Sequence, residues 1–190
     1  MSDPVEVLDF WLGAVGPEGW YGGGDELDAE IRDRFADVWQ AALGGGLDHW
    51  VEGAAGALAF LILTDQFPRN MFRGQAKAFA TDPLARDAAR RAIAAGWDMQ
   101  APEPERQFFY LPFEHSEDAA DQALAVDLTS TRMPASNGET ALHARAHAEI
   151  IRRFGRFPFR NAALGRETTA EEAEFMEQGG YGAIVRALQT

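Results

Sequence analysis

Two arginine-rich turns are the segments of this sequence best suited to chemistry. Residues 65–74 read DQFPRNMFRG, and residues 155–166 read GRFPFRNAALGR. Each contains Phe-Pro, then Arg-Asn, then a glycine beside an arginine. A guanidinium group binds carboxylates and phosphates through paired hydrogen bonds and does not act as a base at neutral pH. The turns therefore predict a site that holds negative charge.

Two interpretations of these turns follow from the sequence. In the first, their side chains hold the phosphate or carboxylate group of a small ligand in a shared cleft. In the second, each proline stops a buried helix, and the arginines bind the unpaired carbonyls and the carboxylate of Asp65 at its carboxyl end. The residues predicted to bind the ligand are Arg69, Asn70, Arg73, Arg156, Arg160 and Asn161.

The segment YLPFEHSEDAADQ, residues 110–122, gathers groups that could transfer protons. Histidine changes charge nearest neutral pH, so His115 with Glu117 is a candidate acid–base pair, and Tyr110 is a third candidate. The competing interpretation is structural. Ser116 would then cap a helix, Glu117 would complement its dipole, and His115 would pack against a neighbour.

His143 and His147 are four residues apart on a predicted helix, a spacing that can bind a metal ion. The sequence supplies neither a third ligand nor the glutamate of an HExxH motif. We therefore expect both to be partly buried, hydrogen-bonded side chains, and we predict no metal site. Phosphate-binding and dinucleotide-binding glycine motifs are also missing, so no cofactor is predicted.

Composition and charge limit the function classes. The chain has 190 residues, no cysteine and a formal net charge of −13, although residues 66–77 and 150–166, which contain most of the two turns, include no acidic residue. An acidic field repels phosphate backbones and anionic lipids, so nucleic-acid and membrane partners are not expected. The longest apolar run, residues 53–64, is shorter than the roughly 20 residues that span a bilayer. We expect a cytoplasmic protein.

Apolar residues recur at helical spacing almost throughout, and strand-like alternation is hard to find. The sequence predicts one all-α domain over residues 1–190, an antiparallel array of about eight helices. The first helix begins at Asp3-Pro4 with Val5, Leu8 and Trp11 on one face, and residues 13–24 form a loop.

Helix boundaries follow from caps and breakers. Pro68 is expected to end a buried helix that begins near Leu47. Ser116 is expected to cap a later helix. Ser136-x-x-Glu139 and Thr169-x-x-Glu172 match the capping-box pattern that begins a helix.

Five stretches together resemble the DUF924 family, a bacterial family of uncharacterised function whose all-α fold is related to tetratricopeptide repeats. They are VLDFW (7–11), LTDQFPRNMFRG (63–74), AFATD (78–82), FYLPFEHSED (109–118) and RFGRFPFRNAALGRETT (153–169). The resemblance covers nearly the whole chain and implies a helical array but no known reaction. Two positions depart from the expected motifs. Phe159 replaces the histidine of FPHRN, and Glu114 replaces the methionine of LPFMHSE.

The loss of a histidine at residue 159 favours binding or structure over proton transfer at the second turn. One hypothesis is a protein that binds a small anionic ligand, with or without converting it. It predicts that both turns meet residues 110–117 around one cleft. The alternative is a tetratricopeptide-like module for a protein or peptide partner, in which the arginines only clamp the fold. The sequence leaves the oligomeric state open.

Overall fold

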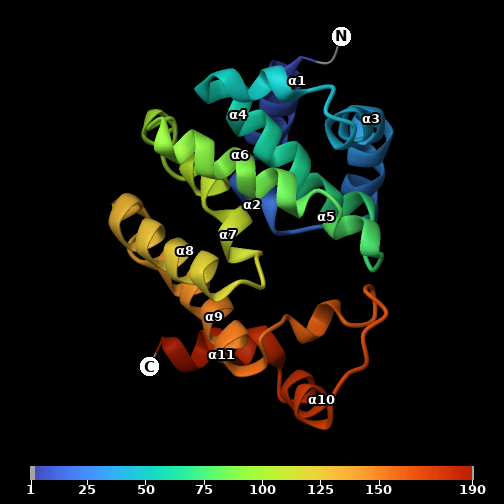
Figure 1. Cartoon of the computed structure of the whole chain (residues 1–190), viewed down its shortest axis with the longest axis vertical. Helices are drawn as coiled ribbons and strands as arrows, with labels where there is room; N and C mark the ends of the chain where they lie inside the picture. The colour runs from blue at the N-terminus through green and yellow to red at the C-terminus, as the bar shows by residue number, and fades with distance from the viewer. Residues whose placement is uncertain (1–2, 190) are drawn as a thin grey trace. The chain divides into compact units, whose positions relative to one another are not determined.

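The computed structural model describes residues 3–189, and these residues are all-α (Figure 1). Nine helices, eight of them with seven or more residues, occur in this part of the chain when runs joined by π-helical turns are counted once. No strand occurs among residues 3–189. The α-helical segments are α1 Pro4–Leu8, α2 Gly16–Trp20, α3 Asp25–Leu43, α4 Ala54–Leu61, α5 Phe67–Met71, α6 Asp82–Ala94, α7 Leu111–Glu114, α8 Ala119–Arg132, α9 Glu139–Phe154, α10 Ala170–Glu177 and α11 Gly180–Leu188.

The chain divides into two compact units, Met1–Pro112 and Phe113–Thr190. In the first, α4 packs against both α1 and α6, and α3 packs against α5 (Figure 1). Its core contains a cluster of rings in which Phe67 lies 4.8 Å from Phe35 and 6.0 Å from Phe10, measured between centroids. All three rings are buried, as expected for the apolar faces of three packed helices. The single domain expected over residues 1–190 stays a prediction.

Two π-helical turns change the expected course of the first unit. The first, Asp9–Val15, joins α1 to α2, so the helix continues to Trp20 and the loop predicted over residues 13–24 is wrong over residues 13–20. The buried face also differs from the predicted one. Val7, Phe10 and Trp11 are buried at the i, i+3, i+4 spacing of one helical face, whereas Val5 is exposed.

The second π-helical turn, Ile62–Gln66, corrects the prediction for Pro68. The helix does not end there, because α5 continues through Met71 and Pro68 lies in its first turn. A proline is tolerated in a first turn because its missing N–H would have no helical partner there. The π turn is buried and polar, and it brings Thr64, Asp65 and Gln66 into the interior.

The second unit is built on α8 and α9, which residues 133–138 connect into a helical hairpin, and α11 packs against α9 (Figure 1). Its core contains Ile150, Ile151, Phe157 and Phe175. Phe154, Tyr181 and Ile184 pack against this core while remaining partly exposed. The second arginine turn lies between α9 and α10, so it connects the core hairpin to the C-terminal helices.

Three caps in this unit test the boundary predictions. The capping box of Thr169 and Glu172 is confirmed, with both reciprocal bonds present. The cap predicted at Ser116 is wrong, because Asp118 accepts from the first N–H groups of α8. The capping box predicted at Ser136 is also wrong. Its hydroxyl donates to the Met133 carbonyl, and α9 follows a left-handed glycine, Gly138, instead.

Candidate functional site

The first arginine turn holds a carboxylate of the first unit. Arg73 donates from Nε and Nη2 to the two oxygens of Asp28, at 2.9 and 3.0 Å, and the amide of Asn70 donates to Asp28 Oδ1 at 2.8 Å. Burial raises the pKa of Asp28, but the hydrogen bonds from Arg73 and Asn70 outweigh it, so this pKa lies below its ordinary value. The arginine turn thus fixes the charged carboxylate of Asp28 near the amino end of helix α3.

Arg69 belongs to the same turn but holds a different helix. Its Nη2 donates to both oxygens of Asp82, at 2.8 and 2.9 Å, and lies 3.8 Å from the buried carboxylate of Asp65. Its Nη1 donates to the carbonyl of Ala78. Asp82 is the first residue of α6, so Arg69 ties the start of that helix to the π turn.

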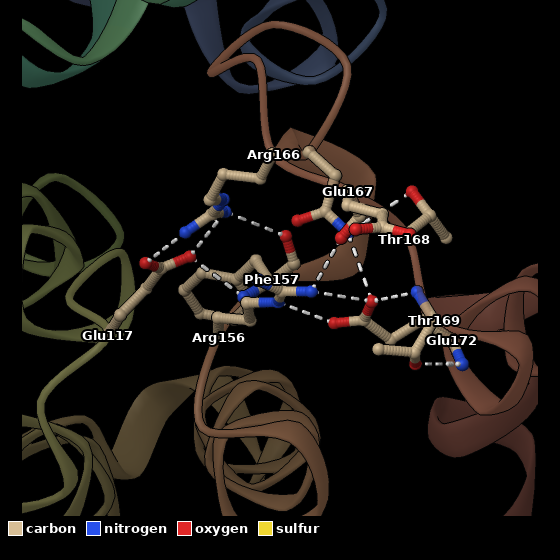
Figure 2. Close-up of polar contacts among 9 residues, drawn as sticks. Glu117, Arg156, Phe157, Arg166, Glu167, Thr168, Thr169 and Glu172 are labelled. Atoms are coloured by element: carbon tan, nitrogen blue, oxygen red, sulfur yellow. Dashed lines mark hydrogen bonds and ion pairs between the residues drawn. The ribbon is translucent and has the colours of Figure 1, made fainter.

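The second turn uses the same chemistry in the second unit (Figure 2). Arg156 donates to both oxygens of Glu172, at 2.6 and 2.8 Å, and Asn161 Nδ2 donates to Glu172 Oε2 at 3.2 Å. The backbone N–H of Thr169 donates to the same oxygen at 2.8 Å. The hydrogen bond from Arg156, with those from Thr169 and Asn161, lowers the pKa of Glu172 to about 2 against the opposing effect of burial.

The two turns therefore share a physical purpose that explains their similar sequences. In each turn, the asparagine of the Arg-Asn pair and a second arginine, Arg73 or Arg156, hold one carboxylate, and that carboxylate lies in the first turn of another helix. Asp28 begins α3 and Glu172 begins α10. Negative charge is favourable at a helix amino end, and the arginine offsets its burial. The structural interpretation from sequence is thus confirmed for the contact of Arg69 with Asp65, whereas the other carboxylates that the two turns hold lie at helix starts, which the sequence did not indicate.

Glu117 contacts the second turn directly. Arg166 donates to both of its oxygens, at 2.8 and 3.0 Å, and the backbone N–H of Phe157 donates to Oε1 at 2.8 Å (Figure 2). Burial raises the pKa of Glu117, but the bonds from Arg166 and Phe157 and the charge of Arg160 lower it more. These contacts suit an anchor that stays ionised, and its part in proton transfer stays a prediction.

Tyr110 belongs to the first unit, whereas His115 and Glu117 belong to the second. Its side chain is fully buried, and its hydroxyl donates to Asp98 Oδ2 at 2.7 Å. This contact is that of a core tyrosine whose polar end is satisfied. Its role in proton transfer also stays a prediction.

A group of imidazoles in the second unit was not part of the predicted site. His147 Nδ1 lies 2.9 Å from the backbone carbonyl of His143 and 3.4 Å from Glu114 Oε2. A carbonyl oxygen only accepts, so Nδ1 is the donor in this contact, and Nε2 is the ring nitrogen left for another partner. Glu114 is buried. A carboxylate that orients an imidazole in this way is an arrangement that serves acid–base chemistry.

Tyr181 on α11 completes this group. Its hydroxyl lies 2.5 Å from His143 Nδ1, and its ring lies 4.9 Å from the His147 ring. Burial and the charge of Glu114 raise the pKa of Tyr181, so the phenol keeps its proton. The spacing of His143 and His147 gave a signal in the sequence, but Tyr181 gave none. No group of three His, Asp or Glu side chains among residues 3–189 is arranged to hold a metal ion.

Phe157 joins the imidazoles to the second turn. The His147 ring meets it edge-on at 5.7 Å, and the Arg160 guanidinium lies over it at 4.5 Å from the centroid. His115 in turn lies 6.0 Å from His147. We call these four residues, His115, His147, Phe157 and Arg160, the Phe157 cluster. Of the residues predicted to act together, it unites His115 and Arg160, while Arg69, Asn70 and Arg73 lie in the other unit.

Comparison with known proteins shows the family of the chain. Residues 7–180 match a family model described as a bacterial protein of unknown function, DUF924. The chain belongs to the DUF924 family. A solved structure of a protein of unknown function from Agrobacterium tumefaciens, ATU0120, is similar at 47% sequence identity with a TM-score of 0.87, covering 93% of this chain and 97% of the other. No curated protein matches.

The family membership expected from five motifs is thereby confirmed. Its members carry no assigned reaction in either description. No helix of residues 3–189 has both the length and the apolar character needed to cross a membrane. The function of this DUF924 protein has to be argued from its own side chains.

Proposed function

We propose that this DUF924 protein binds a small molecule carrying a carboxylate or phosphate group at the Phe157 cluster of the second unit. The observation that carries the proposal is the position of the Phe157 ring, which contacts both the guanidinium of Arg160 and the imidazole of His147. Positive charge, hydrogen-bonding imidazoles and an aromatic wall are the components of an anion-binding site.

Burial makes the positive charge effective. Arg160 is 6% exposed, and a charge in a low-dielectric setting interacts with a ligand more strongly than one surrounded by water. Its charge reaches far enough to lower the pKa of Glu117.

The same cluster would serve an enzyme if the bound molecule is converted. His147 is the side chain best placed for proton transfer, because its Nδ1 lies 2.9 Å from the His143 carbonyl and 3.4 Å from Glu114, which leaves Nε2 as the nitrogen that could meet a ligand. His115 is the neighbouring imidazole. Glu117 would then contribute by positioning, whereas a role for Tyr110 and a cytoplasmic location stay predictions.

The remaining predicted ligand residues receive a different role in this proposal. Arg69, Asn70 and Arg73 hold Asp82 and Asp28 in the first unit, and Arg156 and Asn161 hold Glu172 in the second. We propose that Arg156 and Asn161 fix the backbone of the turn that carries Arg160, and that Arg69, Asn70 and Arg73 have a structural role within the first unit.

Isothermal titration with inorganic phosphate, acetate and succinate tests the proposal. The test variant is Arg160→Gln, and the control is Arg152→Gln, which removes the same charge from an exposed pair with Glu149. We expect the wild type and the control to bind one of these anions, and Arg160→Gln to bind it at least about tenfold more weakly, the loss of one charged hydrogen bond.

Two results would overturn the proposal. Equal binding by Arg160→Gln and the wild type would remove Arg160 from the site. Binding that survives Arg160→Gln but disappears in Arg69→Met would move the site to the first unit. Circular dichroism at the titration temperature checks that each variant is folded.

A tetratricopeptide-like interaction module is the second candidate function. Two observations favour it. Helices α8 and α9 form a hairpin against which α11 packs, and the arginines of both turns hold the protein's own carboxylates. Helix pairs stacked in this way present a surface to a peptide partner in tetratricopeptide arrays. A wild type that binds none of the three anions would favour this function.

A further inference from the structure

The Phe157 cluster borders an exposed aromatic ring. Phe159 is 46% exposed, and its ring stacks on that of Phe157, with the centroids 5.2 Å apart and the planes 30° from parallel. Single exposed apolar side chains are common on protein surfaces and require no explanation by themselves. Phe159 differs because its stack leads directly to the buried guanidinium of Arg160, which lies 5.9 Å from the Phe159 ring and 4.5 Å from the Phe157 ring.

We infer that the anionic ligand carries an aromatic ring next to its charged group, and that Phe159 selects for this ring. This inference rests on the proposed function. An anion held by Arg160 has its remaining atoms beside the face or edge of Phe159. An aromatic ring there gains an offset-stacked or edge-to-face contact, and a saturated ring of the same size gains only apolar contact.

The rigid support of Phe159 strengthens the inference. Phe159 lies in the 3₁₀ turn Pro158–Arg160, and Phe157 beneath it is fully buried in the core of the second unit. The backbone N–H of Phe157 is bound to Glu117, which Arg166 holds in turn. A ring on a fixed support loses less conformational entropy when a ligand stacks on it.

Titration with benzoate and cyclohexanecarboxylate tests the inference, because the two anions share a charge and a ring size but differ in aromaticity. We expect the wild type to prefer benzoate by about three- to tenfold, the range of an aromatic pair contact. Phe159→Leu should lose the preference while still binding both anions. Phe159→Tyr, which keeps the aromatic face, should retain it.

The outcomes separate the inference from the proposed function. Binding of both anions with equal affinity by the wild type overturns the inference and leaves the anion site standing. A preference that persists in Phe159→Leu places the aromatic selectivity elsewhere and also overturns it. Binding of neither anion, together with no binding of phosphate, acetate or succinate, overturns the proposed function and the inference with it.

Discussion

At the scale of single residues, the arginines of this protein act mainly on its own acids. Arg69 shows the principle. Its guanidinium contacts Asp82, Asp65 and the Ala78 carbonyl at once, so one side chain binds several polar groups. Removing one partner of a buried ion pair leaves the other charge without compensation, which costs more than the pair itself contributes.

Arg69→Met should therefore destabilise the first unit by about 2–4 kcal/mol, since it removes a guanidinium that contacts two buried carboxylates. Urea unfolding followed by circular dichroism measures the change. In an Asp82→Asn background the same substitution should cost clearly less, because a neutral amide needs no cation. A cost that is the same in both backgrounds would show that Arg69 stabilises by packing alone.

Arg73→Met is the matched comparison in the same turn. The side chain of Arg73 is 62% exposed, so solvent screens its pair with Asp28, and Asn70 still donates to that carboxylate. We expect a loss of about 1 kcal/mol or less. A loss as large as that of Arg69→Met would contradict this ranking by exposure.

At the scale of the helix, the ion pair between the second arginine turn and the start of α10 makes the free energy of unfolding depend on pH. Glu172 begins α10, and Arg156 holds its pKa at about 2, below the ordinary 4.5. A carboxyl group whose pKa is lowered on folding contributes stability above its unfolded pKa and loses it as the pH falls. The contribution of Glu172 is thus complete above about pH 5 and fades between about pH 4.5 and 2.

Glu172→Gln should lower the stability of the second unit at pH 7 by about 1–2 kcal/mol, because it weakens the capping box and removes the charge held by Arg156. The gap between wild type and variant should narrow as the pH falls towards 2. Urea unfolding across this range measures the gap. Glu149→Gln is the control, because its pair with Arg152 is exposed and the gap should be small throughout. If the difference in unfolding free energy between wild type and Glu172→Gln does not change with pH, the ionisation of Glu172 is not linked to folding.

The helices also show what the sequence could and could not predict. The all-α class and the capping box at Thr169 follow from local patterns, and both are confirmed. The helix end predicted at Pro68 was wrong, because a π-helical turn carries the helix past it and no residue signals such a turn. The buried face predicted at Val5 was wrong, because the helix buries Val7, Phe10 and Trp11 instead. The first residues of α8 and α9 depend on which of several neighbouring residues occupies the N-cap position.

The contacts within the candidate site could not be predicted from the sequence for a related reason. Spacing identified His147 as partly buried, but the contacts to Glu114 and Tyr181 join residues far apart in the sequence. Only the tertiary structure brings α7, α9 and α11 together. The two turns were correctly singled out as similar, whereas the carboxylates that they hold, Asp28 and Glu172, carry no local mark of their partners.

At the scale of the whole molecule, the two compact units have cores of their own. The first gathers Phe10, Phe35 and Phe67, and the second gathers Ile150 and Phe175 with their neighbours. Stability in proteins is divided among cooperative units that open separately when few interactions couple them. Destabilising substitutions should therefore act mainly within the unit that contains them.

Hydrogen–deuterium exchange with peptide-level mass spectrometry can test this division. Arg69→Met should speed exchange in α3, α5 and α6 while α8 and α9 keep the protection of the wild type. Glu172→Gln should speed exchange over residues 155–177 and leave α4 and α6 unchanged, because each lost ion pair loosens only the helix start that it fixed. If either variant speeds exchange equally in both units, the chain opens as one cooperative body. That result would support the single domain predicted from the sequence over residues 1–190.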